Sequence, residues 1–300
     1  MSGGAIMTVA APSASPPSRA LPPGACDAHS HVFGPFDRFP PIERSVYALP
    51  EASPQIHAAI RRVIGAARGV LTQPAPYAND PSAMLAAIAG APRALRGVAV
   101  ADESIDDATL GRWRAGGIAG LRFTEMRTPS GERYPGSVGF AALEALAPRM
   151  REIGMHAQLW ASASQLAEHL PALLRLGVPL VIDHMGCPDP REGPDGPAFA
   201  RVVDLLPDGA LWIKLVICRL SAGGSDFARI RPLHDRLVER APHRLVWGSD
   251  WPYVRIQPAP DAGYFADLVQ DWIEDAELVR RIMVANPAEL YDFNHEEDQA

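Results

Sequence analysis

Lysine is almost absent from this chain of 300 residues. Lysine and arginine together number 28, and Lys214 is the only lysine, so every other basic side chain is an arginine. Chemistry that requires a lysine, such as a Schiff base or a carbamylated residue that bridges two metal ions, therefore has one candidate. The formal net charge of −7 provides no basic excess that would favour nucleic acid as a partner.

Cysteines and long apolar runs are also scarce. The three cysteines, Cys26, Cys187 and Cys218, form no Cys-x-x-Cys pair, which argues against a disulfide framework and against a zinc knuckle. We expect reduced thiols in a cytoplasmic protein. No apolar run approaches the roughly 20 residues that cross a bilayer, so we expect no membrane partner.

The first 24 residues differ in composition from the rest of the chain, because they are rich in alanine, serine, proline and glycine. Their apolar portion, Ala5–Ala11, is short and follows no basic residue, which argues against a secretory signal. We expect residues 1–24 to be a disordered leader, with Met7 as an alternative start. Residues 25–300 then form one domain.

Eight short apolar runs recur after the leader, and helical patterns separate them. This alternation predicts an α/β fold, a single (β/α)8 TIM barrel. A doubly wound sheet is the alternative, but no Gly-x-Gly-x-x-Gly follows the first run. The expected strands are Ala25–Val32, Gly69–Gln73, Gly97–Ala101, Gly120–Thr124, Met155–Trp160, Leu180–Met185, Leu211–Ile217 and Leu245–Asp250.

The segments between these runs carry helix signals. Ser53-Pro54 places a capping side chain before a proline, as at the start of a helix. Phe140–Ile153 and Phe227–Arg240 carry apolar residues at three- and four-residue spacing. The segment Phe33–Arg68 exceeds an ordinary strand-to-helix connection, so we expect a long loop over the barrel mouth after the first strand.

Polar side chains mark the ends of three expected strands. The first strand ends in His29 and His31, the sixth is followed by His184, and the eighth ends in Asp250. The carboxyl ends of the strands in a barrel of this type carry the working residues. Three imidazoles and one carboxylate at that end therefore predict a site for a substrate oxygen or a metal ion.

This set of residues resembles that of the amidohydrolase superfamily, and the resemblance covers nearly the whole chain after the leader. Within the superfamily, the sequence is similar to the branch that contains 2-pyrone-4,6-dicarboxylate hydrolase and related sugar-lactone and sulfomuconolactone enzymes. The resemblance implies a hydrolase that opens the lactone ring of a carboxylate-bearing substrate in the catabolism of aromatic or sugar acids. The similar stretches are Asp27–Pro35, Leu71–Pro74, Gly120–Phe123, Ile182–Gly186, Trp247–Pro252 and Asn286–Tyr291.

The resemblance raises the question of a metal cofactor. Binuclear members of the superfamily need a carbamylated lysine on the fourth strand, and Lys214 lies on the seventh, so that class is excluded. Mononuclear members use a histidine on the fifth strand, where this chain has Gln158 or Trp160 near the mouth and His156 too deep.

The remaining metal alternative is zinc held by His29, His31 and Asp250. We expect no required cofactor, as in the dicarboxylate-lactone hydrolases that the chain resembles. Without a metal, Asp250 takes a proton from water as general base. His29, His31 and His184 donate hydrogen bonds to the lactone carbonyl oxygen as it gains negative charge.

The arginines at the strand ends indicate an acidic substrate. Arg122 lies at the end of the fourth strand, Arg127 in the loop that follows it, and Arg219 after the seventh strand. Their guanidinium groups suit a carboxylate or sulfonate. The resemblance adds Tyr47, in the long first loop, and Thr72, after the second strand, as hydrogen-bonding groups for the substrate.

Three other functions use the same residues. The first is a zinc-dependent hydrolase or decarboxylase of the same superfamily, the second is a lactone isomerase, and the third is a non-catalytic barrel that binds a carboxylated ligand. The stretch Lys214–Arg219 departs from the small, hydroxyl-rich sequence expected of relatives, so the substrate itself stays open, as does the oligomeric state.

Overall fold

Eight parallel strands form the centre of the computed structural model, which describes residues 7–42, 45–128, 130–207, 210–221 and 227–293. Every neighbouring pair is parallel, and the last strand lies against the first, so the sheet forms a nearly closed barrel. The predicted (β/α)8 TIM barrel is confirmed. In order, its strands are β2 (Cys26–Ser30), β4 (Arg68–Thr72), β5 (Leu95–Ala99), β6 (Ile118–Thr124), β7 (His156–Trp160), β8 (Leu180–Ile182), β9 (Leu211–Leu215) and β10 (Leu245–Trp247).

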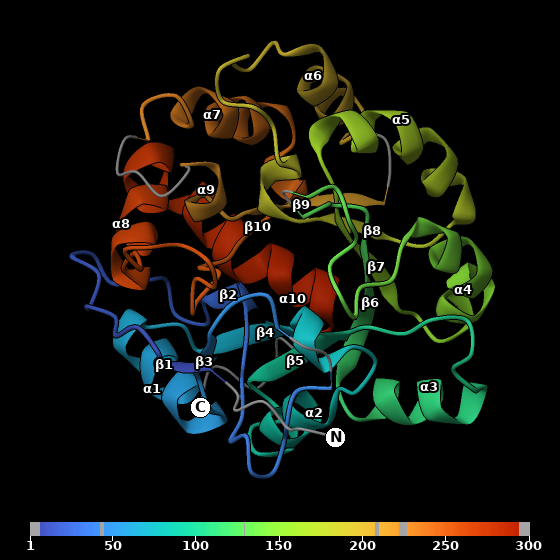
Figure 1. The fold of residues 1–300 in the computed structure, drawn as a ribbon. Helices are drawn as coiled ribbons and strands as arrows, with labels where there is room; N and C mark the ends of the chain where they lie inside the picture. Colours follow the sequence, from blue (N-terminus) through green and yellow to red (C-terminus); the bar gives the residue numbers. More distant parts are fainter. Residues whose placement is uncertain (1–6, 43–44, 129, 208–209, 222–226, 294–300) are drawn as a thin grey trace.

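Helices surround the strands as an outer ring (Figure 1). They are α1 (Pro54–Ile64), α2 (Ser82–Ala89), α3 (Asp107–Ala115), α4 (Phe140–Glu152), α5 (Ala163–Leu173), α6 (Pro197–Asp204), α7 (Arg231–Arg240), α8 (Ala262–Ile273) and α9 (Ala276–Arg280). The last helix, α10 (Asn286–Tyr291), instead lies across the barrel.

The capping signals explain several helix starts. The Ser53 side chain accepts a hydrogen bond from the Ile56 N–H at the start of α1, as predicted. The helix α7 begins at Arg231, four residues later than expected from the apolar spacing. Proline is tolerated in the first turn of a helix and not in its interior, so Pro232 fixes the start of α7 at this point.

The core has two parts. Apolar side chains between the strands and the outer helices form the larger one. The smaller one fills the barrel interior at the amino ends of the strands, where Cys26, Val70 and Trp212 meet Tyr291 of α10 and Phe293. Residues 286–293 therefore close one end of the barrel, which leaves the carboxyl ends of the strands for function.

The segment Phe33–Arg68 is only partly the loop that we expected. It contains the short strand β3 (Leu49–Glu51) and all of α1, and Arg68 already belongs to β4. The irregular part after β2 is therefore shorter, because the Ser53-Pro54 signal starts a helix within the segment. Tyr47 lies in this irregular part.

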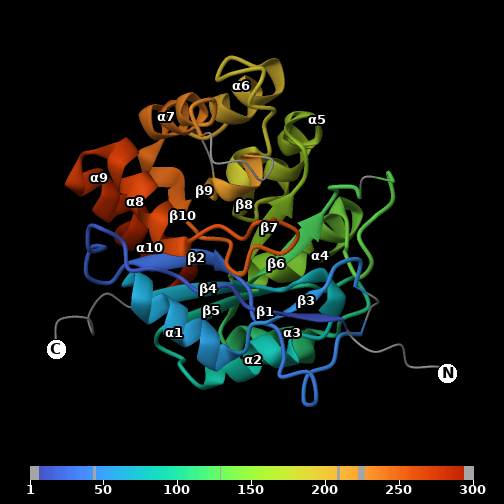
Figure 2. The ribbon, with the colours of Figure 1, turned by 60° about the vertical axis from the view of Figure 1, so that its left-hand side comes forward.

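Residues 7–24 differ from the expected disordered leader. The strand β1 (Thr8–Ala10) pairs in parallel with β3, and the Asp261 carboxylate accepts a hydrogen bond from the Ser15 N–H at 3.1 Å. The Trp251 indole Nε1–H donates to the Pro12 carbonyl at 2.9 Å. Figure 2 shows this N-terminal segment in dark blue along the barrel. Specific backbone hydrogen bonds hold it there, although its composition alone would not. Residues 1–6 lie outside the described residues.

Within the described part of the chain, each helix is either too short or too polar to cross a bilayer.

Candidate active site

The carboxyl end of β2 carries the first two residues of the predicted site. β2 pairs with β4 at Asp27 and again at Ser30, with a register shift between them, and such a bulge redirects the side chains around it. The Asp27 carboxylate accepts hydrogen bonds from the His29 N–H at 3.2 Å and from the Ser249 N–H at 2.8 Å. Asp27 therefore ties β2 to the segment that follows β10.

Asp250 lies in that segment, in the left-handed backbone region (φ 65°). A Cβ atom on Gly248 would lie only 2.6 Å from the Cβ of His29, so glycine is required for this close approach. The Asp250 N–H donates to the His29 carbonyl at 2.8 Å, and the His31 N–H donates to the Trp251 carbonyl at 2.9 Å. The backbone thus holds the Asp250 side chain between the two histidines.

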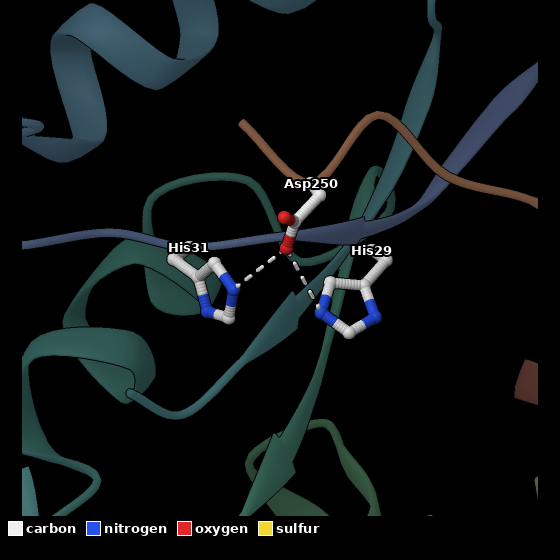
Figure 3. A group of neighbouring side chains, drawn as sticks. All are labelled: His29, His31 and Asp250. Carbon is white, nitrogen blue, oxygen red and sulfur yellow. Dashed lines mark hydrogen bonds and ion pairs between the residues drawn. The ribbon is translucent and has the colours of Figure 1, made fainter. Parts of the chain in front are cut away.

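The Asp250 Oδ1 atom is the centre of the cluster (Figure 3). It lies 3.3 Å from His31 Nε2, 3.5 Å from His29 Nε2 and 3.8 Å from His184 Nε2. All four side chains are buried. The structure therefore brings together the four residues that the sequence predicts as catalytic.

His184 reaches this cluster from the turn that follows β8. Its backbone is also left-handed (φ 51°), and its ring meets the edge of Trp160 with centroids 5.7 Å apart. Neither ring nitrogen has a hydrogen-bond partner among the described residues. Burial lowers the pKa of His184, so a neutral imidazole with unused polar atoms faces the Asp250 side of the site.

Asp183 is a site residue that the sequence analysis missed. Its Oδ1 atom lies 3.2 Å from His29 Nδ1, and its Oδ2 atom accepts from Arg122 Nε at 3.2 Å and Nη2 at 3.0 Å, and from Gln158 Nε2 at 3.1 Å. Although burial opposes its charge, His29, Arg122 and Lys214 hold the pKa of Asp183 well below its usual range. Its position directly before His184, at a strand end, was the available signal.

Lys214 is the second residue that was missed. It is fully buried on β9, and its Nζ donates to the Ala28 carbonyl at 2.8 Å and to Gln158 Oε1 at 2.6 Å. The same Nζ lies 3.5 Å from His29 Nδ1. Burial lowers the pKa of Lys214 to about 8. A single lysine within an otherwise apolar strand was the signal that could have placed it in the barrel interior.

His29 has a partner for either of its neutral tautomers. A proton on Nδ1 would be donated to Asp183, and Nε2 would then offer a lone pair toward Asp250. A proton on Nε2 would leave Nδ1 to accept from Lys214. Burial holds the pKa of His29 well below its usual value, so the ring is neutral in both cases.

His31 has a single tautomer when neutral. Its Nδ1 lies 2.7 Å from the Thr72 carbonyl oxygen, which only accepts, so this nitrogen carries a proton. The Nε2 lone pair then faces the Asp250 carboxylate. Two acceptors this close need a proton or a cation between them. His31 therefore donates from Nε2 only in its doubly protonated form.

The same geometry fits a divalent metal ion. Ligand atoms of His29, His31 and Asp250 lie within 4.8 Å of one another, and His29 Nε2 is buried with no hydrogen-bond partner among the described residues. Asp183 behind His29 is the outer carboxylate that commonly orients a ligating histidine. Two imidazoles and a carboxylate are a donor set that zinc accepts.

Arg219 pairs with the second carboxylate oxygen of Asp250. Its Nε donates to Asp250 Oδ2, and its Nη1 donates to the Val254 carbonyl at 2.6 Å. Burial opposes the charge of Asp250, but Arg219, His184 and His31 hold the pKa of its carboxyl well below the usual range. Asp250 is therefore ionised, with one oxygen directed at the histidines and the other paired with a cation.

Two neighbouring cavities with shared lining residues lie beside this cluster. The inner cavity, of about 70 Å³, is lined by residues that include Asp250, His31, His184 and Tyr47. The outer one, of about 640 Å³, shares Tyr134, Trp160, His184, Arg219 and Arg255 with it. Arg122 and Arg219 both line the inner cavity, so the structure brings two of the three predicted arginines to the same cavity as Asp250.

The three remaining residues that the sequence predicts to bind substrate are Tyr47, Thr72 and Arg127, and only the first of them lines the inner cavity. Tyr47 lines the inner cavity, and burial raises the pKa of its hydroxyl, which therefore remains a donor. Thr72 is buried, and its Oγ1 accepts from Gln158 Nε2 at 3.2 Å. Arg127 is exposed, lines only the outer of the two cavities, and pairs with Glu125 at 3.5 Å.

The profile of the amidohydrolase family matches residues 26–293, and the chain belongs to this family. It is 33% identical over 294 residues to 2-pyrone-4,6-dicarboxylate hydrolase of Comamonas testosteroni, covering 92% of this chain and 93% of the relative. It is 28% identical over 275 residues to 4-sulfomuconolactone hydrolase of Hydrogenophaga intermedia, covering 90% and 89%. D-galactarolactone isomerase of Agrobacterium fabrum is 27% identical over 289 residues, covering 93% and 94%.

A solved structure of a similar protein has the same fold. The probable 2-pyrone-4,6-dicarboxylic acid hydrolase of Acinetobacter baumannii, with citric acid bound, superposes with a TM-score of 0.79 at 26% identity. The match covers 90% of this chain and all of that one. The resemblance to the amidohydrolases is therefore confirmed, and the similar proteins include enzymes named as hydrolases of lactones.

Proposed function

We propose that this protein is a hydrolase that opens the lactone ring of a small carboxylate-bearing substrate, such as a 2-pyrone-4,6-dicarboxylate or a sugar-acid lactone. The observation that carries the proposal is one buried carboxylate, Asp250, surrounded by three imidazoles at the end of a cavity with three arginines. The relatives named as lactone hydrolases support it.

Asp250 is the general base in this proposal. Its carboxyl is ionised and lies at the inner cavity, where it can take a proton from a water molecule that attacks the lactone carbonyl. Arg219 occupies Oδ2 before the substrate binds. A substrate carboxylate that takes over Arg219 would free this oxygen of Asp250 for the proton.

The three histidines stabilise the oxyanion that forms when water attacks. His29 and His184 donate toward the carbonyl oxygen with a proton on Nε2, and His31 does so in its doubly protonated form, because its Nδ1 proton is held by the Thr72 carbonyl. Lys214 supports this tautomer of His29, and the Thr72 carbonyl fixes the orientation of His31. Closely placed donors in a buried site stabilise charge more strongly than water does, because they need no reorganisation.

The arginines hold the acidic groups of the substrate. Arg122 uses Nε and Nη2 for Asp183, so its Nη1 edge remains for a carboxylate in the inner cavity. Arg219 and Tyr47 are the further binding groups at the inner cavity, and Arg127 acts at the outer one. The hydroxyl of Thr72, which the sequence suggested as a binding group, is buried against Gln158 and lines neither cavity. Fixing the ring by its carboxylate aligns the lactone carbonyl with Asp250.

We propose that hydrolysis requires no metal cofactor. The site already holds positive charge, because Arg219 lies on Asp250, and Arg122 and Lys214 lie around Asp183. Gln158 rather than histidine stands at the mouth of β7. If a divalent ion were bound by His29, His31 and Asp250, it would supply Lewis-acid polarisation of the carbonyl or of water.

Isomerisation of a lactone is the second candidate reaction, since a relative is named D-galactarolactone isomerase. It would use the same base and the same binding arginines, and it would give no net acid. We also propose a reducing, cytoplasmic setting, which the three free cysteines support.

Release of acid from carboxylated lactones tests the proposal. We expect the wild-type protein to release one acid equivalent per ring opened. Asp250→Asn should reduce turnover by at least 1000-fold while its melting temperature and its affinity for the ring-opened product change little. Near-normal turnover in Asp250→Asn would remove Asp250 as the base, and product formation without acid release would favour the isomerase.

A further inference from the structure

Five arginines line the two cavities, and one of them differs from the others in its partners. Arg255 lines both cavities and, within the described residues, has no carboxylate within ion-pair distance. It is exposed to the solvent that fills the cavity mouth. In contrast, the pairs that neutralise the other four are Arg122–Asp183, Arg127–Glu125, Arg191–Asp189 and Arg219–Asp250.

Two aromatic rings connect Arg255 to Arg122. The Arg255 guanidinium lies over the Tyr134 ring, 5.2 Å from its centroid, and also donates to the Tyr134 hydroxyl. The Tyr134 ring stacks on Trp160 with centroids 5.2 Å apart and an angle of 25° between the planes. The guanidinium of Arg122 in turn lies 5.0 Å from the Trp160 centroid. Two cations thus stand at the two ends of one aromatic pair, and all four residues line the inner cavity.

The backbone holds Arg255 in place. Arg255 and Tyr253 both have left-handed conformations, with φ of 67° and 59°, which side chains other than glycine seldom adopt. Arg219 Nη1 donates to the carbonyl of Val254, between them. A non-glycine residue kept in this region beside a site is typical of ligand clamps, because strain of this kind persists where the surroundings enforce it.

We propose that Arg255, supported by Tyr134, is a specificity-determining residue that binds a second anionic group of the substrate. This inference rests on the proposed function. The first carboxylate lies at Arg122 and Arg219, the planar ring lies along Tyr134 and Trp160, and a second carboxylate or sulfonate lies at Arg255. An arginine with no acidic partner attracts an anion more strongly than one already neutralised, and its planar fork suits two oxygens. The preferred substrates are therefore lactones with two acidic groups.

The kinetic test compares a pyrone lactone that carries two carboxylates with its analogue that carries one. For Arg255→Gln we expect kcat/KM to fall by 10- to 100-fold on the dianion and by less than 2-fold on the monoanion. Arg255→Lys, which keeps the charge without the fork, should recover part of the loss. Arg191→Gln is the matched control, since Arg191 lines the same outer cavity and is paired with Asp189. Equal losses on both lactones, or no loss on either, would overturn the inference.

A binding test separates this inference from the proposed reaction. Benzene-1,3-dicarboxylate and benzoate serve as unreactive probes in calorimetric titrations, with melting curves to confirm that each variant is folded. The wild-type protein should bind the dianion at least 10-fold more tightly than benzoate, and Arg255→Gln should reduce this preference at least 5-fold. An unchanged preference in the variant, or none in the wild type, would contradict the role of Arg255. Failure of the protein to open any lactone would instead contradict the proposed function alone.

Discussion

Arg122 shows how one side chain serves both the scaffold and the cavity. Its Nε and Nη2 donate to Asp183, which in turn contacts His29 Nδ1. The position of the arginine that lines the inner cavity and the orientation of the histidine that faces Asp250 therefore depend on the same buried carboxylate. Replacing one of these residues should therefore shift the positions of the others, because a buried charge that loses its partner is energetically costly.

Arg122→Met tests this arrangement. We expect kcat/KM for a carboxylated lactone to fall by the equivalent of about 2–4 kcal/mol, because both a substrate contact and the main partner of Asp183 are lost. Steady-state kinetics beside Arg191→Gln as a control would measure it. An unchanged kcat/KM would place Arg122 outside the substrate site.

At this scale the sequence predicted the side chains that gather around Asp250 better than the buried polar groups behind them. His29, His31, His184 and Asp250 could be predicted because strand ends in a barrel converge and these side chains have strong chemistry. Asp183 and Lys214 could not, because the register between neighbouring strands decides which buried polar groups meet, and a single sequence does not contain that register. Arg255 was missed because its position depends on left-handed backbone at Tyr253 and Arg255.

At the scale of elements, the N-terminal segment is the main difference from the expectation. β1 and β3 are three residues each, too short for a periodic pattern, so the sequence could not reveal their pairing. The segment nevertheless reaches the site, because the Pro12 carbonyl accepts from Trp251, the residue after Asp250.

Removal of this segment should therefore weaken the fold. A chain that begins at Leu21 leaves the buried Trp251 indole N–H without its acceptor, and we expect it to be less stable by about 1–3 kcal/mol. Urea unfolding of this chain, beside one that begins at Met7 and keeps β1, would measure the loss. Equal stability of the two chains would mean that residues 7–20 do not hold the barrel.

The eight short apolar runs were predicted more reliably than the connections between them. Each of the eight expected strands overlaps an observed one, since buried parallel strands are apolar along their whole length. The start of α7 was predicted too early, and the segment Phe33–Arg68 was predicted as one loop, because apolar spacing does not locate the ends of helices.

At the scale of the whole molecule, the two ends of the barrel differ: the amino end is closed by packed side chains, and the carboxyl end carries the candidate site. The segment around α10 closes the amino end, where His156 packs against Tyr291 with ring centroids 5.4 Å apart. The carboxyl end carries strained backbone at His184, Asp250 and Arg255. His156 belongs to the closed end, which agrees with the prediction that it lies too deep to act at the mouth.

Buried histidines should make the stability of the whole molecule depend on pH. Burial lowers the pKa of His156 to about 3, whereas an unfolded histidine titrates near 6.5. The unfolded chain therefore binds the proton first, and stability falls as the pH decreases from 6.5 toward 3, by about 1.4 kcal/mol per pH unit for this group. His156→Gln should show a correspondingly shallower loss of unfolding free energy between pH 6.5 and 5. Parallel pH profiles for both proteins would show that His156 is not the group involved.

The central claim is that side chains alone, with Asp250 as base, open a carboxylated lactone. The most direct test is acid release from a carboxylated lactone by enzyme that has been treated with a strong chelator and shown by elemental analysis to be free of metal. The account predicts undiminished turnover, with no increase when zinc is added. Activity that is lost after chelation and restored by zinc would contradict it, and would make His29, His31 and Asp250 the ligands of a catalytic ion.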